Sequence, residues 1–328
     1  MERREFLKTT AAGTVVGLGG LTGSVGATGQ EFPNQDIELI VPWAEGGGTD
    51  RTARALANGA EEILDVSVFV TNRTGGSGSV GFNATSMAEP DGHTVGVLTV
   101  EIVTIEHLGV AEINHEDVAP VMQYNFDPAA LTVREDWEAD DLDGFIQYAE
   151  ENPGEVRVSN SGIGAIWHLS AAGFAQEVGI ELEHIGYDGA APATEAVLGG
   201  EVEATTSSGA EVAPQVLDGP LQTLATFGEE RLDIMPDVPT LIEEDIDFTM
   251  GAWRGLGVPN ETPDERVEVL HDTFQEVFES EEFQGFMDEN GFGTVYRDTE
   301  EFGEFMTDSY EEFGELIDEL GLAEDRDG

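Results

Sequence analysis

Two glycine-containing segments have the residue types and spacing to bind an anion. Each follows a short apolar run that predicts a strand and precedes a stretch that predicts a helix. Backbone N–H groups at the beginning of a helix are unpaired and carry partial positive charge, so such a loop binds a carboxylate without a cationic side chain. The first anion loop comprises Pro42, Trp43, Ala44, Glu45, Gly46, Gly47, Gly48, Thr49 and Asp50, and the second comprises Asn160, Ser161, Gly162, Ile163, Gly164 and Ala165.

Ligands of α/β proteins bind outside the carboxyl ends of the strands, which is where both loops are predicted to lie. Two such loops facing each other would form a receptor for a small carboxylate that closes by hinge motion. Ser161 offers a hydroxyl contact, and His168 lies one turn into the following helix. The glycines also suit sharp strand-to-helix turns without any ligand, and this alternative stays open.

Ser161 and His168 also permit an enzymatic interpretation, as nucleophile and base. The sequence has no G-x-S-x-G motif around the serine, and no third member of a triad can be named. We therefore predict that His168 orients the loop or contacts the ligand, that the protein is not an enzyme, and that it needs no cofactor. An exported enzyme remains the weaker alternative.

Other motifs point to chemistry less strongly. Residues 76–81 match G-x-G-x-x-G, and Glu101 could be a ribose-binding acid, but the match follows the second predicted strand instead of the first. Residues 106–107 and 115–117 contain His, Glu and Asp, yet adjacent side chains rarely point at one ion, so no metal site is predicted.

The charge balance is strongly acidic. The chain of 328 residues has 68 Asp and Glu against 13 Lys and Arg, a formal net charge of −55. Acidic residues are spread along a sequence that is 40% hydrophobic, so we expect a folded protein with an acidic surface. Nucleic acid and anionic membranes are poor partners for it. Self-repulsion at this charge is tolerable where salt screens it, which indicates a halophilic host.

The cysteine count is zero, which excludes disulfides, thiolate metal ligands and thiol nucleophiles. Residues 1–27 resemble a twin-arginine export signal, with Arg3 and Arg4, a weakly apolar stretch broken by glycines, and Val25-Gly26-Ala27 as a cleavage site. A membrane anchor is the alternative, but the stretch is short and weak for a span. We expect a protein outside the cytoplasmic membrane, either free or held by an uncleaved leader.

The rest of the chain alternates predicted strands and helices, which is typical of α/β architecture. Two units share the order strand, glycine loop, helix, and Thr49 or Asp50 is the expected cap of the first helix.

The chain is predicted to cross between lobes at residues 126–133 and to return near Met250, with an acidic, entirely helical end from Asp264. The predicted lobes are residues 28–125 plus 250–328 and residues 126–249. The predicted strands include residues 37–41, 66–70, 94–100, 156–159 and 182–185, and the predicted helices include residues 49–64, 80–88, 142–151, 167–178, 192–198 and 300–319.

Ordered blocks of the sequence resemble the Bug-type (TctC-like) substrate-binding proteins of tripartite tricarboxylate transporters. The resemblance extends over about residues 32–318, and its blocks are residues 40–43, 46–50, 72–78, 90–94, 161–164, 168–169, 187–193, 199–202, 236–240 and 253–256. In this chain Trp43 replaces the usual Phe. Glu45 adds a negative charge that would repel a ligand carboxylate unless its side chain points to solvent.

The resemblance implies a two-lobed periplasmic-binding-protein-like fold, of the type II or Venus flytrap kind, with the ligand cleft between the lobes. The two anion loops would hold the ligand carboxylate, with a further contact from the loop after Tyr187, including Ala190. The implied partners are the large and small membrane subunits of the transporter, and we expect a monomer. A sensory receptor that presents its ligand to a membrane signalling protein is the alternative function.

Overall fold

The computed structural model describes residues 32–323, so the predicted export signal lies outside the described residues. The first strands and helices alternate as the apolar runs predict, and they begin and end close to the predicted positions. They are β1 (Ile37–Val41), α1 (Gly48–Leu64), β2 (Val68–Asn72), α2 (Ser79–Ser86) and β3 (Thr94–Thr99).

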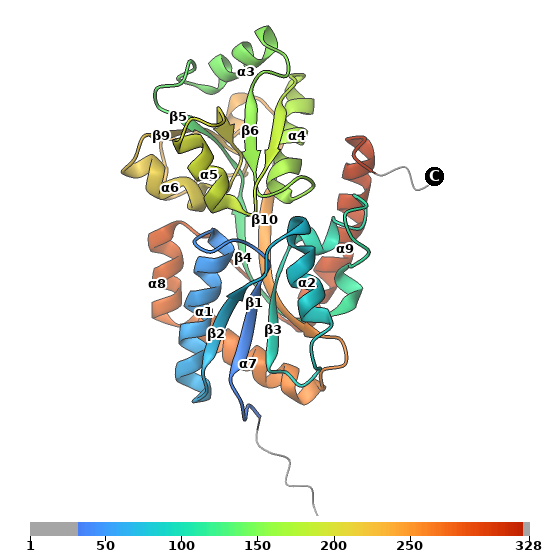
Figure 1. Cartoon of the computed structure of the whole chain (residues 1–328). Coiled ribbons are helices and arrows are strands. Elements are labelled where there is room, and N and C mark those ends of the chain that lie inside the picture. The colour runs from blue at the N-terminus through green and yellow to red at the C-terminus, as the bar shows by residue number, and fades with distance from the viewer. Residues whose placement is uncertain (1–31, 324–328) are drawn as a thin grey trace, which may run out of the picture. The chain divides into compact units, whose positions relative to one another are not determined.

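The first lobe is built on a six-stranded mixed sheet with the order β11-β4-β10-β3-β1-β2. Strand β1 pairs in parallel with β2 and β3, whereas β4 (Val118–Pro128), β10 (Gly251–Pro259) and β11 (Thr294–Arg297) are antiparallel to their neighbours. Figure 1 shows α1 and α8 (Glu281–Asn290) on one side of this sheet and α2 and α9 (Thr299–Glu319) on the other.

The second lobe is built on a five-stranded sheet with the order β7-β6-β8-β5-β9. Its strands are β5 (Ala130–Arg134), β6 (Arg157–Asn160), β7 (Glu183–Gly186), β8 (Ala204–Thr205) and β9 (Leu221–Thr226), and its helices are α3 (Leu142–Glu151), α4 (Ile166–Val178), α5 (Ala190–Leu198) and α6 (Gly209–Leu217). Two mixed sheets with helices confirm the predicted α/β, two-lobed fold class.

Two extended segments connect the lobes. Strand β4 of the first sheet ends at Pro128, and β5 of the second sheet begins two residues later at Ala130. The returning chain enters β10 at Gly251. The N–H of Ala129 donates to the carbonyl of Met250 at 2.9 Å, so the two crossing segments are hydrogen-bonded to each other. Paired extended segments of this kind suit a hinge.

The prediction that the chain is entirely helical from Asp264 is wrong at β11. Helix α7 (Asp264–Glu279) and α8 are followed by Gly291, whose φ of +70° ends α8, and then by a strand that pairs with β4. The segment Thr-Val-Tyr-Arg is rich in β-branched and aromatic residues, which favour strands.

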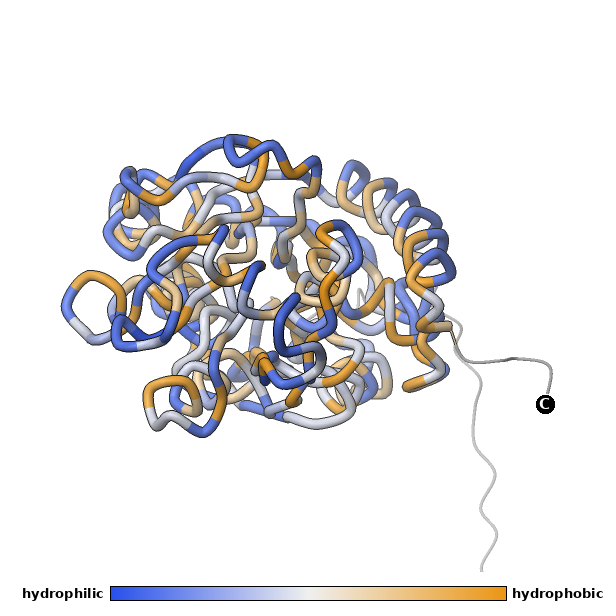
Figure 2. The backbone as a smooth tube through the Cα atoms, turned by 90° about the horizontal axis from the view of Figure 1, so that it is seen from above, coloured by the Kyte–Doolittle hydropathy of each residue, from blue (hydrophilic) through white to orange (hydrophobic). Residues whose placement is uncertain are grey.

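Helix α9 then packs against the first lobe, with Phe302, Met306 and Ile317 buried. Hydrophobic and hydrophilic residues alternate along the outer helices, as Figure 2 shows.

Candidate functional site

Helix α1 begins in the first anion loop and is capped by a residue of the other lobe. Its N-cap is Gly47, in an extended conformation, and glycine has no side chain with which to cap a helix. The N–H of Gly48, which has no partner within the helix, donates to Oε1 of Glu211 at 2.7 Å. Glu211 belongs to α6, so a carboxylate of the second lobe lies on the positive end of a helix of the first lobe.

The prediction that Thr49 or Asp50 caps α1 is wrong, because both side chains have other partners. The hydroxyl of Thr49 accepts a hydrogen bond from Nε of Arg254 at 3.0 Å. Asp50 accepts from the N–H of Gly46 at 2.9 Å and forms an ion pair with Arg54 at 3.0 Å. Asp50 therefore stabilises the loop from within and does not face the cleft.

Glu211 and Arg254 approach the backbone of Gly48 closely. A Cβ atom at this position would lie 2.8 Å from both Oε1 of Glu211 and Nη2 of Arg254. The second carboxylate oxygen of Glu211, Oε2, accepts from the N–H and hydroxyl of Ser208 in a capping box at the beginning of α6. One carboxylate thus caps two helices from different lobes.

Helix α4 begins after the second anion loop and belongs to the second lobe, and it is capped by a residue of the first lobe. Its N-cap is Ala165, whose methyl group cannot accept a hydrogen bond. The N–H of Ile166 donates to Oε1 of Glu101 at 2.9 Å. Glu101 follows β3 of the first lobe, and its Oε2 accepts from the hydroxyl of Thr99. Burial raises the pKa of Glu101, while the Ile166 amide and the Thr99 hydroxyl oppose that rise.

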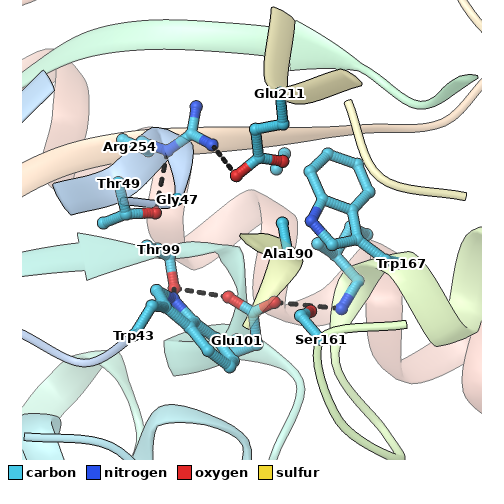
Figure 3. A pocket seen from close by; sticks show the side chains of 12 residues that line it. Trp43, Gly47, Thr49, Thr99, Glu101, Ser161, Trp167, Ala190, Glu211 and Arg254 are labelled. Carbon is cyan, nitrogen blue, oxygen red and sulfur yellow. Dashed lines mark hydrogen bonds and ion pairs between the residues drawn. The ribbon is translucent and has the colours of Figure 1, made fainter. Parts of the chain in front are cut away.

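The lobes meet along a closed cleft. Besides the two glutamate contacts, the N–H of Ala44 donates to the carbonyl of Asp188 at 3.1 Å, and the hydroxyl of Ser77 donates to the carbonyl of Ile163 at 2.7 Å. A cavity of about 20 Å³ remains between the lobes, which is room for about one water molecule. The lining, part of it drawn in Figure 3, consists of Trp43, Gly47, Thr49, Thr99, Glu101, Ser161, Ile166, Trp167, Ala190, Glu211, Ala252 and Arg254.

Arg254 of β10 is the cation of this site, and it is 2% exposed. Its guanidinium donates to Asp127 and Asn125 of β4 and lies 3.5 Å from the Glu211 carboxylate (Figure 3). Burial lowers the pKa of Arg254, but the charges of Asp127 and Glu211 outweigh that effect and raise it above its usual range. The guanidinium therefore stays charged and is already largely neutralised by Asp127.

His168 orients the second anion loop. Its Nδ1 accepts a hydrogen bond from the N–H of Gly164 at 3.1 Å, which requires the neutral ring with its proton on Nε2. Burial and the neighbouring His184 lower the pKa of His168 to about 4, in agreement with that assignment.

Ser161 lies in the same loop, lines the cavity and is 4% exposed. Among the described residues, its hydroxyl has no hydrogen-bond partner, so no hydrogen bond joins it to His168 as nucleophile to base.

The predicted site residues fall into two groups. Trp43, Gly47, Thr49, Ser161 and Ala190 line the cavity. The others do not line it, and they are Pro42, Gly46, Asp50, Gly162, Gly164, Ala165, His168 and Tyr187. The side chain of Glu45 is 80% exposed and points away from the cleft, so it leaves the first anion loop accessible to a carboxylate.

Sequence reasoning missed Glu211 and Arg254 as site residues and considered Glu101 only as a ribose-binding acid, although each left a signal. Glu101 follows the carboxyl end of a strand, which is the ligand-binding edge. Glu211 completes the capping-box pattern S-x-x-E. Arg254 is a lone charge in an apolar strand, which indicates a buried ion pair.

The competing motifs have other roles. Glu101 is directed at the beginning of α4, and Ser77 of the glycine-rich segment contacts the second lobe instead of a phosphate. Within residues 32–323, no group of three metal-ligating side chains is arranged to hold an ion.

Fold and site together define a two-lobed solute-binding protein. Residues 52–322 match the model of the tripartite tricarboxylate transporter family receptor, TctC, and the chain belongs to this family. The family and its solved members are binding proteins, not enzymes, as the sequence predicts for this chain.

Individual relatives match over nearly their whole length. A Cupriavidus necator protein named for its position in the gbd 5′ region is 28% identical over 98% of this chain and 99% of its own. A TctC solute-binding protein from Polaromonas, solved without ligand, is 37% identical with a TM-score of 0.65, over 88% of this chain and 99% of that one. The periplasmic binding protein BugD is 26% identical with a TM-score of 0.85, over 89% of this chain and 99% of that one.

Proposed function

We propose that this chain is an exported receptor that captures a small carboxylate between its lobes for a tripartite tricarboxylate-type transporter. The observation that carries the proposal is the occupancy of both helix N-termini by carboxylates. The amides of Gly48 and Ile166 lie 2.7 and 2.9 Å from the carboxylate oxygens of Glu211 and Glu101. Amides with this geometry can bind a ligand carboxylate in the same way when the lobes separate.

Binding would proceed by opening and closing of the lobes, with boundaries at residues 28–125 plus 250–328 and 126–249. Separation about the crossing segments at Ala129 and Met250 would withdraw each glutamate from the helix of the opposite lobe, because each contact joins the two lobes. A ligand carboxylate would then take the freed amides, and closure would remove it from water.

The proposed setting is outside the cytoplasmic membrane, reached by the twin-arginine route, in a halophilic organism. Ten arginines remain after residue 27, and no lysine does. The solved relative BugD is described as a periplasmic binding protein, which supports an extracytoplasmic site of action. None of the helices in the described part of the chain is both long and apolar enough to cross a membrane. The receptor would act as a monomer and pass its ligand to the large and small membrane subunits.

A thermal-shift screen in 3 M KCl tests the proposal. The purified protein is heated with a panel of mono-, di- and tricarboxylates, and each acid is paired with its neutral amide as a control. A ligand at about 100 times its Kd should stabilise the protein by roughly 2.7 kcal/mol. We expect one class of acids to raise the midpoint temperature of unfolding and the matching amides to leave that temperature unchanged. Equal shifts with acids and amides, or no shift with any acid, would contradict the carboxylate assignment.

A further inference from the structure

Each of the two cleft glutamates is anchored in its own lobe and extends one carboxylate oxygen to the other lobe. Oε2 of Glu211 lies in the capping box of α6, while its Oε1 accepts from the N–H of Gly48 at 2.7 Å. Oε2 of Glu101 accepts from the hydroxyl of Thr99 (Figure 3), while its Oε1 accepts from the N–H of Ile166 at 2.9 Å. Because one oxygen of each carboxylate is already fixed, little conformational freedom is lost when the other oxygen reaches across the cleft.

The two glutamates act in opposite directions across the cleft. Glu211 brings negative charge from the second lobe to the positive end of α1, and Glu101 brings negative charge from the first lobe to the positive end of α4. Arg254 of the first lobe lies 3.5 Å from the carboxylate of Glu211 and adds an attraction between the lobes. All of these contacts join groups of the same chain, so they favour closure of the lobes without a bound molecule.

A ligand carboxylate and the glutamates exclude each other. The amides of Gly48 and Ile166 each have one hydrogen to donate, and in the closed arrangement Glu211 and Glu101 accept them. The cavity that remains has room for about one water molecule, which is less than a carboxylate with a carbon chain occupies. A ligand therefore enters only while the lobes are apart, and it replaces a glutamate at each amide that it uses.

We infer that Glu211 and Glu101 form an internal latch, which closes the lobes when no ligand is bound and thereby limits affinity. This inference rests on the proposed function, and it holds for any carboxylate that the cleft binds. Only open molecules admit a ligand, so the apparent Kd is the intrinsic Kd divided by the open fraction. A latch that leaves about one molecule in ten open weakens binding about tenfold. A bound carboxylate lowers the open fraction further, because it holds the helix N-termini in place of the glutamates.

Distances between spin labels on the two lobes test the latch without a ligand. The chain has no cysteine, so Met87→Cys at the exposed end of α2 and Glu177→Cys on the exposed side of α4 place one label on each lobe. Double electron–electron resonance in 3 M KCl without any carboxylate should show mainly the short distance of the closed form. In the double variant Glu101→Ala and Glu211→Ala a longer distance should predominate.

Two further double variants serve as controls. Glu61→Ala with Glu150→Ala removes one exposed glutamate from each lobe, on α1 and α3, and should leave the distances unchanged. Glu101→Gln with Glu211→Gln keeps an oxygen that accepts from the amide and removes the charge, so it should open less than the alanine variant. Circular dichroism checks the fold of each variant, and the glutamine variant takes the place of the alanine variant if the latter is unfolded.

Calorimetric titration with acetate, succinate and citrate measures the effect on affinity, with one acid for each class of the panel. An acid that binds the wild type should bind the alanine variant about tenfold more tightly, a difference of about 1.4 kcal/mol. These substitutions would also relieve repulsion between a glutamate and an anionic ligand, but that relief alone does not change the distances measured without a ligand. The distances therefore separate the latch from charge repulsion.

Each result bears on the latch separately from the proposed function. A long distance that already predominates in the ligand-free wild type would overturn the inference, as would equal distances in the wild type and the alanine variant. An alanine variant that stays closed yet binds more tightly, or one that opens without binding more tightly than a wild type that binds the same acid, would overturn it as well. All of these results leave the carboxylate receptor intact. If the alanine variant opens but no acid of the panel binds to either protein, the latch is upheld and the proposed carboxylate receptor is wrong.

Discussion

Arg254 connects β10, β4 and α1 and approaches α6 through one buried guanidinium. It donates to Asp127, Asn125 and Thr49 and lies 3.5 Å from Glu211. Arg254 and Asp127 are 2% and 1% exposed, so each charge depends on the other for its solvation. Such a pair adds little net stability over an apolar pair, but removal of one partner leaves a buried charge without compensation.

Arg254→Ala should therefore lower the free energy of unfolding by about 3–5 kcal/mol, measured by urea denaturation in 3 M KCl. The matched control is Arg134→Ala, which removes an arginine whose ion pair with Asp136 is partly exposed. That change should cost less than about 1 kcal/mol. Similar losses in the two variants would show that Asp127 finds another partner or is exposed to water.

His168 should make stability depend on pH. Its pKa is lowered to about 4 in the folded protein, first by burial and then by His184, against about 6.5 when unfolded. The unfolded state binds more protons between these pH values. The contribution of His168 to the free energy of unfolding is therefore complete above pH 6.5 and is lost as the pH falls toward 4.

His168→Gln keeps an acceptor near the N–H of Gly164 but does not titrate. The loss of unfolding free energy between pH 7 and pH 5 should be smaller in the variant than in the wild type by about 2 kcal/mol. His271→Gln, in which a partly exposed histidine of α7 is replaced, serves as the control. An unchanged pH dependence in His168→Gln would mean that the ring titrates normally.

At the scale of elements, α1 and α4 begin at the cleft and lack capping side chains of their own. Gly47 and Ala165 precede α1 and α4, and glutamates from the opposite lobe take the exposed amides. The beginning of each helix is thus complete only when the lobes are closed. This arrangement couples the local stability of both helix N-termini to closure.

Gly48→Ala tests this coupling. Its Cβ would lie 2.8 Å from Glu211 and Arg254, so closure would require both to move. Affinity for the carboxylate found in the screen should fall at least about tenfold, which corresponds to about 1.4 kcal/mol. Gly285→Ala in α8 has open space around the new methyl group and should leave affinity unchanged while slightly stabilising the helix. Calorimetry that finds equal affinities in the two variants would contradict the prediction that a methyl group at position 48 obstructs closure.

At the scale of the whole molecule, charge and closure act together. A formal net charge of −55 repels the lobes from each other as well as the chain from itself. The unliganded Polaromonas relative is more identical to this chain than BugD is, yet its TM-score is lower. If the two lobes of the Polaromonas relative were opened to a different degree than those of this chain, its TM-score would be lower in spite of the higher identity.

Salt should therefore stabilise the protein by screening. The Debye length falls from about 10 Å at 0.1 M to about 3 Å at 1 M salt, so repulsion between surface carboxylates weakens strongly. We expect the unfolding midpoint to rise steeply between 0.1 and 3 M KCl. Sorbitol at equal osmolarity, which favours burial without screening, should give a smaller rise. A protein that is equally stable in dilute buffer would refute adaptation to salt.

The parts of the site that sequence could predict are those defined by neighbouring residues. Both anion loops follow from the order strand, glycine, helix, which is local. Glu211 and Glu101 were missed because their partners Gly48 and Ile166 lie 163 and 65 residues away along the chain and are reached only when the lobes close. The strand β11 was missed because acidic helical sequence surrounds it on both sides.

Residues of both lobes also line a larger hollow of about 580 Å³, which shares no residue with the cavity at the two helix N-termini; its lining includes Arg231, Asp233, Asp288 and Gly293. Hydrogen–deuterium exchange with and without a saturating carboxylate distinguishes the two locations. We predict that the ligand slows exchange of the amides in residues 46–50 and 161–166, because closure buries both helix N-termini. Protection confined to residues 230–234 and 288–294, or no protection at either place, would contradict a carboxylate site at the beginnings of α1 and α4.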